Sequence, residues 1–133
     1  MEKKIFEKMH KLACKLAKEN NDLIKKTGYS TVACVIMGES GKLYTGINVA
    51  WDHCFCAEII ALGNALQAGE RKMKYSVGVK FNKRNNQLHS VTPCGVCREM
   101  FNQVCPEIKI AYIDNNEIEV KSINQMLPEK EQK

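Results

Sequence analysis

Three cysteines and one glutamate have the types and spacing of a metal-dependent hydrolytic site. Cys94 and Cys97 are separated by two residues, a spacing at which two thiolates commonly bind one metal ion. Cys56 lies 38 positions before Cys94 and can supply a third thiolate, and Glu58 follows Cys56 by two residues. Three protein ligands leave one position for water, as in catalytic zinc sites, whereas four ligands make a closed structural site. We therefore predict a zinc hydrolase in which Glu58 moves protons.

Two neighbouring residues bear on this prediction. Arg98 directly follows Cys97 and could donate a hydrogen bond to a ligand sulfur, which would offset the negative charge of three thiolates; a surface arginine is the alternative. Cys54 could join the other three cysteines in a closed four-cysteine site with no water position. That alternative would make the chain a zinc-binding protein without catalysis, whereas we expect Cys54 and His53 to lie in a loop near the pocket mouth.

The composition is typical of one globular domain spanning residues 1–133. Apolar residues make up 44% of the chain and charged residues 26%, which is ordinary for a globular protein of this length. No signal peptide or run of ~18 apolar residues is evident, so we expect a cytoplasmic protein that does not span a membrane. In that compartment the seven cysteines are expected to bind metal or be buried. The net charge of +5 comes from scattered lysines, which favours a solvated basic face over nucleic-acid binding.

Hydrophobic periodicity and turn residues predict a layered α/β domain. Helices are expected at 4–26, 56–68 and 122–127, and in a segment that Thr92 caps, Pro93 opens and Pro106 ends. Strands are expected at 30–37, 43–49, 75–81, 108–113 and 118–120, with the first two forming an antiparallel hairpin. The intervening segments are predicted as a short connection (50–55), a polar loop (82–89) and a polar tail (128–133). This order, α-β-β-α-β-α-β-β-α, predicts a three-layer α/β/α fold with a mixed sheet of about five strands.

Two motifs resemble the paired signature of the cytidine deaminase family. They are Cys56-Ala57-Glu58 and Pro93-Cys94-Gly95-Val96-Cys97-Arg98, and the likeness is greatest to the blasticidin S deaminase branch. Tyr29-Ser30 is similar to the family's entry to its first strand, and residues 45–49 are similar to its second strand. The resemblance implies the family's fold, a zinc ion on the three cysteines, and attack of an activated water on C4 of cytosine with release of ammonia. It also implies a homotetramer whose sites are completed by neighbouring subunits.

The resemblance further implies which residues meet the substrate. Glu58 would carry protons to the ring N3 and to the departing amine. The backbone of Ala57 would meet the pyrimidine O2, and the carbonyl of Thr92 would meet the exocyclic amine. Asn48 would contact the sugar, and Ser30 is expected in the substrate site as well.

The chain departs from the family mainly where the sugar binds. Ordinary cytidine deaminases carry an Asn-x-Glu pair that binds ribose hydroxyls, whereas Asn48-Val49-Ala50 lacks the glutamate. Ile59 stands where these enzymes often have arginine, the usual phenylalanine is not evident after Ser30, and the connection before Cys56 is shorter. A modified cytosine nucleoside of the blasticidin S type fits these losses better than cytidine or deoxycytidine, although the chain lacks the blasticidin enzyme's aromatic tail. Deamination of a base in RNA or DNA is less favoured, because those enzymes typically use histidine as the first ligand.

Overall fold

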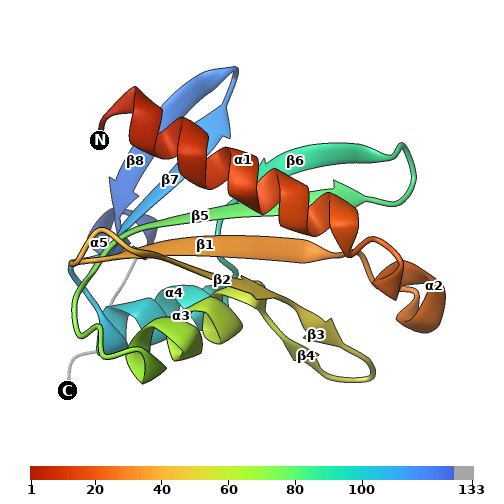
Figure 1. The fold of residues 1–133 in the computed structure, drawn as a ribbon, viewed down its shortest axis with the longest axis horizontal. Coiled ribbons are helices and arrows are strands. Elements are labelled where there is room, and N and C mark those ends of the chain that lie inside the picture. Colours follow the sequence, from red (N-terminus) through yellow and green to blue (C-terminus); the bar gives the residue numbers. More distant parts are fainter. Residues whose placement is uncertain (128–133) are drawn as a thin grey trace.

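The chain forms a six-stranded mixed sheet with helices on both faces (Figure 1). The computed structural model describes residues 1–127, with the backbone alone for residues 24 and 25, so the predicted tail at 128–133 lies outside the described residues. The helices are α1 (Lys3–Glu19), α2 (Leu23–Thr27), α3 (Ala57–Gln67), α4 (Gly95–Val104) and α5 (Ile123–Met126). The strands are β1 (Val32–Gly38), β2 (Leu43–Ile47), β3 (Val49–Ala50), β4 (Cys54–Phe55), β5 (Met73–Asn82), β6 (Gln87–Val91), β7 (Lys109–Asp114) and β8 (Glu117–Ser122). The predicted layered α/β architecture is confirmed.

The sheet is built around β1 and β5. Its order is β2-β1-β5-β7-β8, and β6 pairs with the C-terminal half of β5. The predicted β1–β2 hairpin is present and antiparallel, with Ala33 opposite Ile47. β5 and β7 run parallel, so the chain must cross over between them, and α4 lies in that crossover. All but the first residue of β1 are buried, as expected for a strand covered on both faces.

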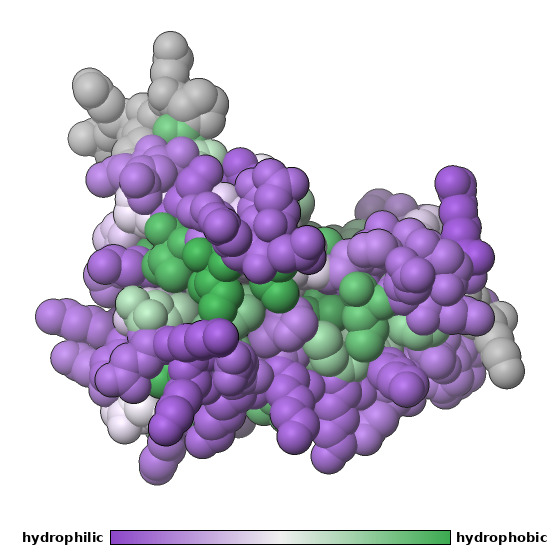
Figure 2. All heavy atoms as spheres, turned by 90° about the horizontal axis from the view of Figure 1, so that it is seen from above, coloured by the Kyte–Doolittle hydropathy of each residue, from purple (hydrophilic) through white to green (hydrophobic). Residues whose placement is uncertain are grey.

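The helices divide the core into two layers. α1 covers one face through residues at helical spacing, Phe6, Met9, Ala13 and Ala17, while α3 and α4 cover the other face, where Phe101 is fully buried. Figure 1 shows α1 above the sheet and α3 with α4 below it. Seen from above, the surface is mostly hydrophilic, with apolar residues gathered in two separate areas (Figure 2). No helix within residues 1–127 combines the length and the hydrophobicity needed to cross a membrane.

The single helix predicted at residues 4–26 is wrong, because two helices occupy that segment. α1 ends at Glu19, and Asn20 leaves the helical conformation with φ −101° and ψ 17°. The Asn20 side chain donates to the Leu16 carbonyl at 2.8 Å, and its own carbonyl accepts from the Thr31 hydroxyl at 2.9 Å. Asparagine side chains compete with helical hydrogen bonds in this way, and the apolar pattern alone does not reveal it. Gly28, with φ +79°, follows α2 as predicted.

Two segments predicted as irregular contain strands. Residues 82–89 are predicted as a polar loop, but β6 begins at Gln87 and pairs antiparallel with β5. Residues 50–55 are predicted as a short connection, but β3 and β4 form a small antiparallel hairpin that projects from the body (Figure 1). The three strands β3, β4 and β6 are short, so their pairing comes from the neighbouring strand rather than from local propensity. The main sheet therefore has six strands instead of five.

Gly46 allows β2 to lie directly against α3, the helix that carries Glu58. A Cβ atom at Gly46 would lie 2.5 Å from the Ala61 nitrogen and 2.7 Å from the Ala57 oxygen. Both are backbone atoms of a helix, which cannot move aside as a flexible side chain can. By contrast, a Cβ at Gly63 in the same helix would meet no atom within 4 Å.

We predict opposite effects for alanine at these two glycines. Gly46→Ala should lower the free energy of unfolding by about 1–3 kcal/mol, because it forces β2 and α3 apart. Gly63→Ala should raise it by about 0.5–1 kcal/mol, because alanine is the better helix former. Urea unfolding of the two variants beside wild type is the measurement. Equal stabilities for the two variants would contradict the close approach of β2 and α3.

Candidate active site

The starts of two helices bring three cysteines together. Cys56 and Cys94 are the residues that precede α3 and α4, both with extended backbone, and Cys97 lies in the first turn of α4. The Cys56 and Cys94 sulfurs are 3.4 Å apart, and all three sulfurs lie within 4.8 Å of one another. Neither Cys56 nor Cys94 uses its side chain to cap its helix, so the sulfurs are available to a ligand.

This donor set fits a zinc ion. Thiolates bind zinc at about 2.3 Å in tetrahedral geometry, which puts neighbouring sulfurs about 3.8 Å apart. The three sulfurs already lie near that separation, whereas neither Cys54 nor Glu58 belongs to the group. Three thiolates without a fourth protein ligand leave one coordination position open, as in catalytic zinc sites.

Glu58 lies in the first turn of α3, in the same small cavity as Cys56 and Cys94. The cavity has a volume of about 180 Å³ and is lined by Val32, Asn48, Cys54, Cys56, Ala57, Glu58, Val91, Thr92 and Cys94. Glu58 is only 7% exposed, and its burial raises the pKa of the carboxyl group although a backbone hydrogen bond opposes the shift. A buried carboxyl group with a raised pKa can hold a proton as well as accept one, which suits proton transfer at neutral pH.

The thiols differ in acidity when no metal is bound. Burial, followed by the Cys94 thiol, raises the pKa of Cys56 to about 11, and burial together with the Glu58 charge raises the pKa of Cys97 well above its ordinary value. Burial also acts to raise the pKa of Cys94, but hydrogen bonds from the Cys97 backbone and from the other two thiols bring it below its ordinary value. Helix position alone would lower all three thiol pKa values, so burial outweighs it at Cys56 and Cys97. A metal ion must displace protons from these two thiols.

Comparison with known proteins assigns the family. Residues 3–113 match the protein family described as the cytidine and deoxycytidylate deaminase zinc-binding region. The chain belongs to this family. It is 22% identical over 119 residues to the blasticidin-S deaminase of Bacillus cereus, and the match spans 85% of each chain. It is 28% identical over 102 residues to the cytidine deaminase of Sporosarcina psychrophila, and this match spans 73% of this chain and 71% of the relative.

Solved structures of similar fold are cytidine deaminases. The enzyme from Bacillus anthracis superposes with a TM-score of 0.67 at 21% identity, over 90% of this chain and 86% of that one. The enzyme from Mycobacterium leprae gives a TM-score of 0.64 at 23% identity, over 90% of this chain and 97% of that one. The predicted deaminase family and its fold are therefore confirmed.

The residues predicted to bind substrate divide between two cavities. Asn48, Ala57 and Thr92 line the cavity that holds Glu58, whereas Ser30 lines a neighbouring cavity. The Asn48 side chain is also engaged: its oxygen accepts from the Val32 backbone nitrogen at 2.8 Å, and its nitrogen donates to the Ser30 carbonyl at 3.0 Å. These bonds brace the start of β1, and they leave Asn48 one amide hydrogen and one lone pair for any sugar of a deaminase substrate.

The β3–β4 hairpin is the part of the site that the sequence did not predict. Cys54 is exposed and lines the cavity, but it lies on β4 rather than in the expected loop, and His53 does not line the cavity. Trp51 and Phe55 are 44% and 49% exposed, with ring centroids 5.7 Å apart, and His53 packs edge-on against Trp51. Trp51 and His53 lie in the turn between the two-residue strands, which are too short to give a periodic signal in the sequence.

Arg98 fits neither of its two interpretations, because it donates to three oxygens rather than to a sulfur and is not fully exposed. Its Nε donates to the Pro93 carbonyl at 2.8 Å, one terminal nitrogen donates to the Met126 carbonyl at 3.0 Å, and the other donates to the Thr92 hydroxyl at 3.2 Å. These bonds hold Thr92 and Pro93 outside the helix, so Cys94 precedes α4 and the predicted start at Thr92 and Pro93 is wrong by two residues. Arg98 thus ties the turn before Cys94 to the end of α5.

We predict that Arg98→Lys releases bound zinc faster than wild type, by about tenfold or more. Lysine has no planar fork, so it cannot hold three acceptors on two segments as arginine does, and the turn before Cys94 loosens. The measurement is the rate of zinc transfer to a chromogenic chelator.

The matched control is Arg71→Lys. Arg71 also donates to two backbone carbonyls, those of Leu66 and Glu70, but at the far end of α3. The rate of zinc release from Arg71→Lys should equal that from wild type. Indistinguishable rates for the two lysine variants would show that Arg98 does not stabilise the metal site.

Proposed function

We propose that this member of the deaminase family is a zinc-dependent hydrolytic deaminase of cytosine nucleosides or cytosine-nucleoside-like compounds. One observation carries the proposal: three sulfurs from two helix starts lie within 4.8 Å of one another, and the buried carboxyl group of Glu58 lines the same cavity. Cys56, Cys94 and Cys97 would hold the zinc ion. When bound there, zinc would supply Lewis acidity that makes a water molecule nucleophilic near neutral pH.

The residues of this chain then account for the proton transfers. Glu58 takes a proton from the attacking water and gives it to N3 of the cytosine ring, while the water oxygen forms a bond to C4. Glu58 next takes the second proton of that oxygen and gives it to the exocyclic amine, so that the C4–N4 bond breaks and ammonia leaves. The backbone of Ala57 would meet O2, and the Thr92 carbonyl would accept from the amine. Both residues line the cavity.

The substrate and the assembly are proposed from family likeness and the site. The relatives include both a blasticidin-S deaminase and cytidine deaminases, so the first panel is blasticidin S, cytidine, deoxycytidine and cytosine. We also propose a homotetramer, supported by the large exposed apolar side chains of the β3–β4 hairpin beside the cavity.

We predict that Glu58→Gln reduces deamination by about 10²–10⁴-fold and leaves zinc bound. Glutamine keeps the shape of the side chain but cannot accept and return a proton. Ammonia release from the substrate panel and metal analysis of the same samples are the two measurements. Glu39→Gln, a substitution of an exposed carboxylate on the turn after β1, is the control and should match wild type in both.

Loss of zinc together with activity in Glu58→Gln would mean that Glu58 supports the metal site rather than the chemistry. Unchanged turnover would remove Glu58 from the mechanism. Either result contradicts the proposed proton transfer.

The second candidate function is a closed zinc site of four cysteines without catalysis. Cys54 favours it to a limited extent, because Cys54 is exposed and lines the same cavity as Cys56 and Cys94. The three-sulfur group that already fits a metal does not include Cys54, which favours the catalytic site.

We predict that Cys54→Ser keeps one zinc per chain and retains deaminase activity, whereas Cys97→Ser loses the metal. Serine removes one thiolate in each case, so the pair is matched in chemistry. Metal content after dialysis against a moderate chelator is the measurement. Loss of zinc from Cys54→Ser would instead support the closed structural site.

A further inference from the structure

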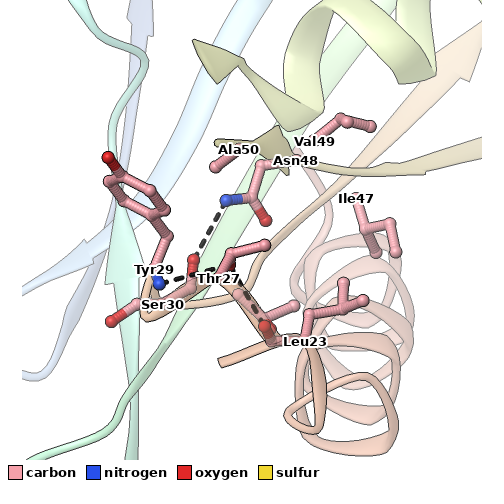
Figure 3. Close-up of a pocket in the computed structure, with 9 residues that line it drawn as sticks. Leu23, Thr27, Tyr29, Ser30, Ile47, Asn48, Val49 and Ala50 are labelled. Atoms are coloured by element: carbon pink, nitrogen blue, oxygen red, sulfur yellow. Dashed lines mark hydrogen bonds between the residues drawn. The ribbon is translucent and has the colours of Figure 1, made fainter. Parts of the chain in front are cut away.

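A cavity of about 450 Å³ lies where α1 begins, at the end of the sheet where β1 ends and β5 and β7 begin (Figure 1). We call it the α1–β5 cavity. The cavity drawn in Figure 3 adjoins the candidate active site through Asn48, whereas the α1–β5 cavity shares no lining residue with the cavity of Glu58. Its volume falls in the range of about 300–1,000 Å³ that is usual for small-molecule sites.

The α1–β5 cavity and the cavity of Glu58 lie at opposite ends of β1. Val32, the first residue of the strand, lines the cavity of Glu58, and Met37, near its end, lines the α1–β5 cavity. A strand rises about 3.3 Å per residue, so these two residues are about 17 Å apart. Met37 also packs in the core layer beneath α1, on the face of the sheet away from α3. A ligand in the α1–β5 cavity would therefore be separate from a substrate of the candidate active site.

The register of the sheet arranges the floor of this cavity from apolar to cationic. Met37 on β1 lies opposite Tyr75 on β5, and Tyr75 lies beside Lys109 on β7, so the three side chains stand on one face of the sheet. Met37 is buried, Tyr75 is half-buried and Lys109 is exposed. Neighbouring strands are about 4.8 Å apart, which puts the backbone of the lysine about 10 Å from that of the methionine. Ile5 of α1 adds a further apolar side chain to the lining.

Three ammonium groups of the lining have no partner among the side chains and backbone that the structure describes. They belong to Lys72, Lys74 and Lys109, which are all exposed. The two ion pairs in the described part of the chain are both on α1, and none of the three lysines donates a side-chain hydrogen bond there. Three ammonium groups around one apolar floor attract an anionic group.

Two carboxylates line the cavity as well, but they do not neutralise these lysines by contact. One oxygen of Glu107 accepts from the Met73 backbone nitrogen at 3.0 Å, and the exposed Glu39 forms no ion pair with any of the three lysines. Three lysines and two glutamates leave the lining with a net charge of +1. This balance suits a ligand with one negative charge.

We propose that the α1–β5 cavity binds an aromatic compound that carries one anionic group, a sulfonate or a carboxylate. The ring packs on the apolar end of the floor, and the anionic group meets the ammonium groups at the other end. An apolar surface alone would accept neutral and charged rings alike, whereas this cavity distinguishes them. The inference does not rest on the proposed deaminase function.

The test compares naphthalene-2-sulfonate with methyl 2-naphthyl sulfone, which has the same ring and nearly the same shape but no charge. Titration calorimetry of zinc-loaded wild type should give a dissociation constant for the sulfonate about tenfold below that for the sulfone, because several exposed ammonium groups each add a modest attraction. The difference should shrink in about 1 M salt, which screens exposed charges.

Two double variants with equal charge loss locate the ligand. Lys74→Gln/Lys109→Gln should raise the dissociation constant of the sulfonate about fivefold and leave that of the sulfone unchanged. Lys18→Gln/Lys80→Gln changes two exposed lysines that line neither this cavity nor the cavity of Glu58, and it should bind both compounds as wild type does. Glu39→Gln removes a negative charge from the lining and should bind the sulfonate more tightly, a gain that misfolding cannot produce.

Equal dissociation constants of the two compounds in wild type would overturn the proposal, because the cavity would then act as an apolar surface only. No measurable binding of the sulfonate at millimolar concentration would overturn it too. The same holds if the two double variants change sulfonate binding equally or not at all, since the ligand would then respond to net charge or lie elsewhere. Turnover is not measured, so a failure of the proposed deaminase function would leave these results unaffected.

Discussion

The site depends on two helix starts that point into one small volume. The sequence separates Cys56 from Cys94 by 38 residues, yet the packing of α3 and α4 on one face of the sheet brings their sulfurs to 3.4 Å. Burial opposes the charged forms of Glu58, Cys56 and Cys97, and at the two thiols the charges of Glu58 and of the neighbouring sulfurs add to this effect. The raised pKa values of Glu58, Cys56 and Cys97 record this cost. A divalent cation would turn the repulsion into attraction, which is why the cluster suits a metal better than it suits a set of buried thiols.

The surrounding structure fixes these helix starts by different means. α3 is held by backbone contact with β2 at Gly46, where no side chain intervenes. α4 is held through its first turn, where Arg98 fastens the preceding turn to the carbonyl of Met126, a residue buried in the same core as Phe101. Ser122 and Gln125 cap α5 reciprocally, which fixes the helix that supplies this acceptor. The contacts that fix the candidate metal site therefore reach as far as α5, the last described helix of the chain.

The sequence predicted the residues of the site better than the hydrogen bonds and strand pairings that hold them in position. Cysteine spacing and the position of Glu58 were sufficient to select the three sulfurs that the fold brings together and the carboxyl group beside them, because such motifs are local and chemically specific. The hydrogen bonds of Arg98 were not predicted, because its acceptors are backbone and hydroxyl oxygens that leave no trace in the sequence. The break at Asn20 and the strand at Gln87 were missed for a related reason. In both places a tertiary partner, Thr31 for one and β5 for the other, outweighs local propensity.

The residues proposed for proton transfer and metal binding and those proposed to meet the substrate's sugar lie on different parts of the fold. The thiols and Glu58 sit at helix starts packed against the sheet, where any shift in backbone would separate the sulfurs. Asn48 and the hairpin that follows it lie at the edge of the sheet, with Val49, Trp51 and Phe55 exposed. Changes at that edge alter the walls of the cavity without moving the helices. Substitutions between β2 and β4 would therefore reshape the cavity wall while the thiols and Glu58 stay in place at the helix starts.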